Sequence, residues 1–149
     1  MKTNVFPFFI VIFLSLLTQV SFAQQNSKDQ LVAEINQLLK SEKMWDYESL
    51  AVENSGTLKH IICLNPECNP YISWDFYIKN VKPVKLGKMD DYVTIDFACN
   101  EADCIIPPGY VQGGRYEMKK ELQFIIKDKK AGELIVKKLN ELQLMNFDK

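Results

Sequence analysis

Apolar and polar residues alternate along two stretches in the middle of the chain. Apolar side chains occupy every second position of Ile72–Ile78, and the same alternation runs through Tyr92–Cys99. A period of two places successive side chains on opposite faces of a strand, so one face is expected to be buried and the other wet. The pattern therefore predicts an antiparallel sheet that is covered on one side.

Weaker alternation predicts further strands before and after these two. Trp45–Val52 and Leu58–Leu64 are expected to pair around the turn sequence Asn54-Ser55-Gly56. Val81–Leu86 contains Pro83, which favours an edge strand or a bulge because proline has no N–H for a strand ladder. The remaining predictions in this region are a turn over Gly87–Asp91 and a last strand over Tyr116–Ile126.

The apolar period changes to that of a helix at both ends of the predicted sheet. A first helix is expected to begin at the N-cap Ser27, because Ser27 and Gln30 fit a capping box. Its apolar face would carry Leu31, Ile35, Leu38 and Leu39. A final helix is expected after Asp128, with an apolar face made by Leu134, Ile135, Leu139 and Leu142.

Residues 1–23 have the layout of a secretory signal peptide. Lys2 precedes the apolar run Val5–Leu17, and Ser21-Phe22-Ala23 places small residues at a cleavage site. The apolar run is shorter than the ~20 residues that a membrane helix needs, so no stable membrane insertion is expected after cleavage. We therefore predict a secreted or periplasmic protein with one domain over residues 24–149, a length that suits a single core.

A helix, six to seven short strands and a closing helix indicate an α+β domain. This order, with its amphipathic C-terminal helix, resembles the pleckstrin-homology-like superfold. The resemblance covers Trp45–Met145 and depends on element order alone. It implies an antiparallel sheet or a partly open barrel, with the C-terminal helix closing one end. It also implies binding of peptides, proteins or lipid head groups more often than catalysis. A cystatin-like curled sheet is the alternative fold.

The four cysteines form two pairs with the same spacing, Cys63-x4-Cys68 and Cys99-x4-Cys104. In an exported chain an even number of cysteines indicates disulfides first. Pairing within each Cys-x4-Cys is the simplest connectivity, and pairing between the two loops is the alternative. Four thiolates could instead hold zinc, and free or redox-active thiols are a third interpretation.

Other residue types give little support for a reaction. His60 is the only histidine, and no nucleophile stands beside it in a local motif, so we interpret it as structural. The acidic residues at 90, 91, 101 and 103 do not form a calcium-loop pattern. The net charge of −1 gives no field that would attract nucleic acid. We therefore predict no catalytic residue, no metal and no cofactor.

The function expected from these observations is non-catalytic binding of an unknown protein or small ligand. The loop Pro107–Gly114 and the lysines that recur at every third residue from Lys79 to Lys88 are the surfaces proposed for it. A lysine-rich sheet edge is also a common defence against aggregation. The candidate binding residues are Tyr110, Val111, Gln112, Arg115, Lys82 and Lys85. A metal-binding or thiol-redox protein and a small exported inhibitor or immunity-type protein are the alternatives.

Overall fold

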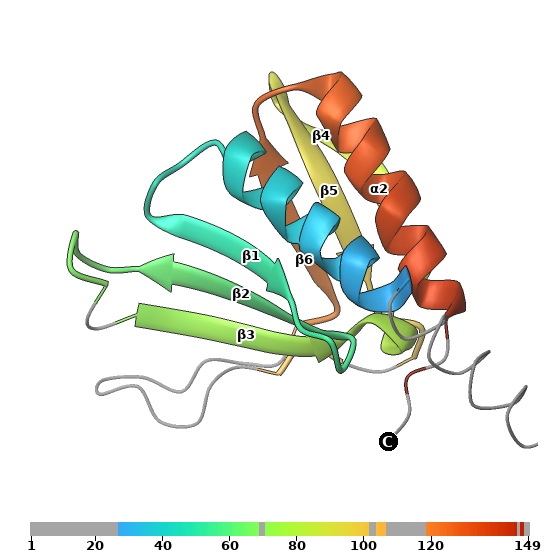
Figure 1. The fold of residues 1–149 in the computed structure, drawn as a ribbon. Coiled ribbons are helices and arrows are strands. Elements are labelled where there is room, and N and C mark those ends of the chain that lie inside the picture. The colour runs from blue at the N-terminus through green and yellow to red at the C-terminus, as the bar shows by residue number, and fades with distance from the viewer. Residues whose placement is uncertain (1–26, 69–70, 102–103, 107–118, 146, 148–149) are drawn as a thin grey trace, which may run out of the picture.

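The structure is a computed structural model that describes residues 27–68, 71–101, 104–106, 119–145 and 147. The predicted signal peptide lies outside the described residues. A helix over residues 27–42 comes first, and Figure 1 shows it next to the final helix, across the same side of the strands. The elements that follow are β1 (Glu48–Val52), β2 (Thr57–Cys63), β3 (Tyr71–Tyr77), the 3-10 helix η1 (Ile78–Asn80), β4 (Lys85–Met89), β5 (Tyr92–Ala98), β6 (Glu121–Ile126) and α2 (Lys129–Leu144).

The first sheet has the order β1-β2-β3, and both pairs are antiparallel. The predicted turn joins β1 to β2, and Gly56 has a φ of 83° there, a conformation that favours glycine. Leu50, His60 and Trp74 lie opposite one another in adjacent strands, and all three are buried. The inner face of this sheet is therefore mainly apolar, with one histidine in its central row.

The second sheet has the order β4-β5-β6, again antiparallel. A two-residue turn at Asp90-Asp91 joins β4 to β5, and Met89 pairs with Tyr92 on either side of it. The turn predicted over Gly87–Asp91 is therefore wrong for Gly87, Lys88 and Met89, which belong to β4. The strand predicted over Val81–Leu86 is too early for the same reason, since β4 begins at Lys85.

The predicted α+β class is confirmed, but the predicted single sheet or barrel is not. The described strands form two open sheets of three strands each. Isolated bridges connect them: Ile105 pairs with Lys119 just before β6, and Ile106 pairs with Asp75 of β3. Alternation shows which side chains share a face of one strand, whereas the partition into two sheets depends on contacts between distant residues.

The core fills the space between the two sheets and the helices. Phe76 of β3 and Phe97 of β5 meet edge to face, with ring centroids 5.2 Å apart, where the inner faces of the two sheets come together. The other large, fully buried side chains are Phe124, Ile35, Leu39, Leu58, Ile78, Ile95, Ile105, Ile126, Ile135, Leu139 and Leu142. Both helices and both sheets contribute to this set, so the described elements share one core.

The two helices largely follow their predicted apolar faces. The Asp128 side chain accepts a hydrogen bond of 2.8 Å from the Ala131 N–H and so caps α2. Leu134 differs from the prediction because it is 42 % exposed. Ser27 is already helical, so it is not the N-cap that the sequence suggested. None of the helices in the described part of the chain is long and apolar enough to cross a membrane.

Each helix uses an asparagine to hold an edge of one sheet. The Asn36 side chain accepts from the Val52 N–H at 2.7 Å and donates to the Val52 carbonyl at 2.8 Å. In α2, Asn140 accepts from the Val84 N–H at 2.8 Å and donates to the Val84 carbonyl at 3.0 Å. These amides take the place of a neighbouring strand, so the backbone groups of both valines are paired without extending either sheet.

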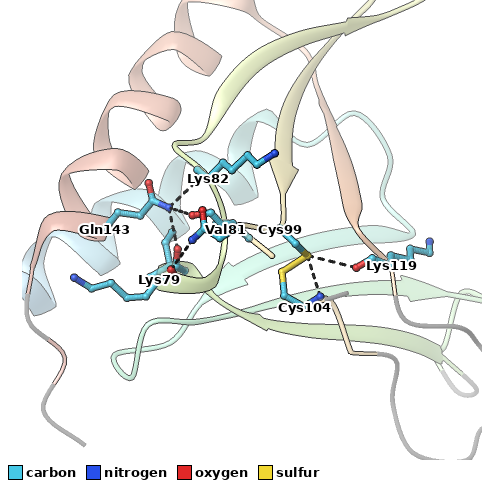
Figure 2. Close-up of a disulfide and its surroundings, with 9 residues drawn as sticks. Lys79, Val81, Lys82, Cys99, Cys104, Lys119 and Gln143 are labelled. Carbon is cyan, nitrogen blue, oxygen red and sulfur yellow. Dashed lines mark hydrogen bonds between the residues drawn. A yellow bond between two sulfur atoms is a disulfide. The ribbon is translucent and has the colours of Figure 1, made fainter. Parts of the chain in front are cut away.

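Polar contacts also join the helices to each other and to the segment after η1. The Lys138 ammonium donates to the Glu34 carboxylate at 2.5 Å, and this hydrogen bond holds the pKa of Glu34 below its usual range. The Gln143 side chain donates to the carbonyls of Ile78 and Val81, at 2.9 and 3.0 Å. Figure 2 shows Gln143 on one side of the Val81–Lys82 segment and a disulfide on the other.

Candidate functional site

The ladder between β4 and β5 is interrupted around Pro83. The Lys82 N–H still reaches the Ala98 carbonyl at 2.7 Å. Pro83 has no N–H, and Val84 turns its backbone groups toward Asn140, away from β5. Regular pairing resumes only where Lys85 lies opposite Asp96. The chain therefore bends away from β5 over two residues, which confirms that Pro83 marks an irregular edge strand.

A hollow of about 330 Å³ lies beside this interruption, and we call it the Pro83 hollow. Asp96 alternates with the buried residues Ile95 and Phe97, so its side chain is on the outer face of the second sheet, away from the core. The hollow is lined by Lys82, Pro83, Lys85, Leu86, Asp96, Phe97, Ala98, Glu121, Leu122 and Gln123. Its walls carry charges of both signs, and apolar residues separate them.

One acidic group in the lining of the hollow, the Asp96 carboxylate, is fixed in place. The Asp96 carboxylate accepts hydrogen bonds from the Thr94 hydroxyl at 2.6 Å and the Gln123 amide at 3.2 Å. Its second oxygen lies over Gly87, where a Cβ atom would come within 1.9 Å of it. Gly87 is therefore needed for close approach, because any side chain there would displace the carboxylate.

The two basic groups are less constrained. Within the part of the chain that the structure describes, neither Lys82 nor Lys85 forms an ion pair with a carboxylate. Lys85 is exposed and stands directly opposite Asp96, yet the Asp96 carboxylate is bonded to Thr94 and Gln123. Two ammonium groups are thus available to an incoming anionic group at the rim of the hollow.

Of the candidate binding residues, the structure brings Lys82 and Lys85 together at this hollow. Tyr110, Val111, Gln112 and Arg115 lie outside the described residues, as does the whole predicted loop Pro107–Gly114. Spacing predicted the two lysines, whereas Asp96, Glu121 and Gln123 were not predicted. These three are polar residues on the outer faces of β5 and β6, and nothing in the local sequence distinguishes them from other exposed strand residues.

All four cysteines form disulfides, and each bridge closes within its own Cys-x4-Cys pair. The Cys104 N–H donates to the Cys99 sulfur at 2.9 Å, and Figure 2 places this bridge beside Lys119. Each short ring stabilises the fold by roughly 2 kcal/mol in the chain-entropy model. Paired sulfurs are not thiolates, and thiolates are the ligands that the alternative four-cysteine zinc site requires. No three His, Cys, Asp or Glu side chains among the described residues are placed to hold a metal ion.

The two bridges differ in their access to solvent, and we expect them to be reduced in a fixed order. Cys63 and Cys68 are both half-buried in a surface turn, whereas in the second bridge only Cys104 is half-buried and Cys99 is 5 % exposed. A thiolate reductant must reach a sulfur atom to attack it, so Cys63–Cys68, which has two accessible sulfurs, should open faster than Cys99–Cys104, which has one. Timed reduction of the native protein, followed by alkylation and peptide mass spectrometry, measures both rates. In guanidinium the two rates should converge; faster opening of Cys99–Cys104 in the native protein would contradict the expectation.

The sequence did not predict a buried, hydrogen-bonded glutamate–histidine pair on the inner face of the first sheet. Glu48 Oε1 of β1 lies 2.6 Å from His60 Nε2 of β2, and both side chains are buried. Trp74 stacks on the imidazole and Phe124 meets it edge to face, at centroid distances of 5.6 and 6.1 Å. The structure therefore places His60 in the core as a buried, paired residue, and its structural role stays a prediction.

Comparisons of this chain with protein-family models, with curated proteins and with solved structures give no match. The functional interpretation therefore depends on the geometry of the sites themselves.

Proposed function

We propose that this protein is an exported, non-catalytic binding domain that is stabilised by two disulfides and takes its ligand at the Pro83 hollow. The observation that carries the proposal is the pair of exposed lysines, Lys82 and Lys85, in the lining of a hollow that also contains the apolar residues Pro83 and Ala98. A volume of about 330 Å³ is within the range of small-molecule sites, roughly 300–1,000 Å³.

The lining of the hollow favours a particular kind of ligand. Lys82 and Lys85 would attract a carboxylate or another anionic group, while Pro83 and Ala98 supply apolar surface beside them. Glu121 and the fixed Asp96 carboxylate would repel a ligand that is anionic throughout. We therefore propose a ligand with one anionic end and an apolar body, such as the carboxyl-terminal residues of a peptide.

Export is part of the proposal. The sequence of residues 1–23 supports it, and two disulfides are typical of an oxidising compartment. We also retain the resemblance to the pleckstrin-homology-like superfold as a proposal, since short antiparallel strands followed by an amphipathic C-terminal helix support it. Binding of a peptide would be consistent with that resemblance.

Binding can be tested on the ¹⁵N-labelled mature chain, residues 24–149, with acetyl-leucyl-leucine as the probe. Backbone amide signals of Lys85, Asp96 and Gln123 should shift during the titration. The corresponding terminal amide, acetyl-leucyl-leucinamide, has no carboxylate and should bind at least tenfold more weakly, a difference of about 1.4 kcal/mol.

The double variant Lys82→Gln/Lys85→Gln should show the same loss of affinity for the free acid. Lys130→Gln/Lys137→Gln is the matched control, since it removes two exposed lysines from α2 and should leave binding unchanged. The proposal is wrong if the acid and the amide bind equally well, or if the shifts map elsewhere on the domain.

A further inference from the structure

Three aromatic side chains gather where the chain crosses from the second sheet to the first. Trp45 and Tyr47 stack, with ring centroids 5.6 Å apart and planes 11° apart. Tyr92, the first residue of β5, meets Trp45 edge to face at 6.3 Å. We call Trp45, Tyr47 and Tyr92, together with Met89, the aromatic patch.

Both sheets hold the backbone of this patch. The Met44 N–H donates to the Ile125 carbonyl of β6, and the Tyr47 carbonyl accepts from the Cys63 N–H of β2 at 2.7 Å. Tyr92 and Met89 are a directly opposed pair on β5 and β4. The rings are therefore presented on two anchored segments, so little conformational entropy remains to be lost when a partner binds.

The patch is exposed although it is apolar. Tyr47, Tyr92 and Met89 are 49, 41 and 38 % exposed, and Trp45 between the two tyrosines is half-buried. Tryptophan, tyrosine and methionine are enriched at the centres of protein interfaces, and exposed groups of them mark interaction sites. Scattered single apolar residues need no such explanation, but these rings contact one another.

Acidic residues border the patch. Asp90-Asp91 forms the tight turn between Met89 and Tyr92, and both residues are exposed. Within the described residues, neither of these aspartates forms an ion pair. Lys88 alternates with Met89 and so points to the other face of β4.

A second acidic position lies between the stacked rings in sequence. Asp46 stands between Trp45 and Tyr47, and the Lys43 ammonium is 3.8 Å from its carboxylate. Lys43 also donates to the Asp46 carbonyl at 3.2 Å. The Lys43 ammonium is therefore held beside Asp46 and balances the charge of its carboxylate. The unpaired charge beside the patch is therefore that of the Asp90-Asp91 turn.

We propose that the aromatic patch and the Asp90-Asp91 turn form a docking site for a basic segment of a partner protein. A guanidinium or ammonium group over an aromatic face is attracted by the ring, and the nearby carboxylates add charge complementarity. The site lies toward the opposite end of β5 from the Pro83 hollow: along the strand, Tyr92 is about 13 Å from Asp96 and about 20 Å from Ala98, which both line the hollow. It is a second site, independent of the proposed hollow ligand.

The experiment uses the mature chain labelled with 5-fluorotryptophan and a hexa-arginine peptide as the probe. The chain has two tryptophans, and two separate ¹⁹F signals are expected because Trp74 is buried and Trp45 is only half-buried. A Trp45→Phe variant assigns the two signals. Hexa-arginine should shift the Trp45 signal and leave the Trp74 signal in place. Asp90→Asn/Asp91→Asn should weaken binding at least fivefold, and asparagine tolerates the left-handed φ of 53° at position 90. Tyr92→Ala should weaken it at least tenfold.

Two controls separate this proposal from its rivals. Glu133→Gln/Glu141→Gln removes the same charge from α2 and should change the affinity less than twofold, as should Lys82→Gln/Lys85→Gln at the hollow. Equal weakening by the α2 variant would show attraction by net charge alone and would overturn the proposal. A Trp45 shift with cellohexaose and none with hexa-arginine would overturn it too, in favour of a carbohydrate site.

Discussion

Replacing His60 with alanine should lower the free energy of unfolding by about 3–5 kcal/mol. The imidazole is buried between Trp74 and Phe124, so truncation opens a cavity. It also leaves the Glu48 carboxylate buried without the only hydrogen-bond partner that it has in the described part of the chain. Urea unfolding followed by circular dichroism measures the loss.

A double-mutant cycle would separate the two contributions. Glu48→Leu/His60→Leu removes both polar groups and should cost much less than the sum of Glu48→Leu and His60→Leu, because no buried polar group is then left without its partner. The matched control is the exposed pair Glu53–Lys59 on the same sheet, 3.2 Å apart, whose removal should cost at most about 1 kcal/mol. Additive costs at Glu48 and His60 would show that the pair is not coupled.

Replacing Phe97 with alanine should cost about 3–5 kcal/mol, because the phenyl ring is fully buried where the two sheets meet. The loss of its edge-to-face contact with Phe76 removes a direct link between β5 and β3. Exchange of backbone amide hydrogens should therefore accelerate in both sheets by similar factors, because the inner faces of both sheets lose packing contacts when the Phe97 ring is removed.

Leu134→Ala on α2 is the matched control for Phe97→Ala. It removes a large apolar side chain that is already partly in solvent, so its cost should be about 1 kcal/mol or less. Faster exchange confined to β4, β5 and β6 in Phe97→Ala would show that the sheets are stabilised separately, contrary to the shared core inferred here.

Strand positions were predictable where alternation was regular, and poorly predictable where other contacts decide the backbone. The strands expected at Ile72–Ile78 and Tyr92–Cys99 became β3 and β5 with shifts of one residue at most at each end. β4 begins four residues later than expected because Asn140, far along the chain, takes the backbone groups of Val84. No local pattern around Pro83 indicates that contact.

The candidate site shows the same division. The lysine spacing indicated Lys82 and Lys85, but not that Val84 beside them bonds to Asn140 of α2 and leaves the ladder with β5 next to the hollow. Glu48 and His60 lie in different strands, and only the register of β1 and β2 brings them together. From sequence alone, a charged residue in a short strand is predicted to be exposed. Only the strand register shows which residue on the neighbouring strand can pair with it in the core.

The two asparagines that hold Val52 and Val84 have a consequence for motion in the native state. Each asparagine side chain links a helix to a sheet by hydrogen bonds. A helix therefore cannot move away from its sheet without breaking the hydrogen bond of one valine N–H and exposing it to solvent. Slow opening of either layer would thus be visible as deuterium uptake at a single, known backbone position. Deuterium uptake at the Val52 N–H would report on the first helix, and uptake at the Val84 N–H would report on α2.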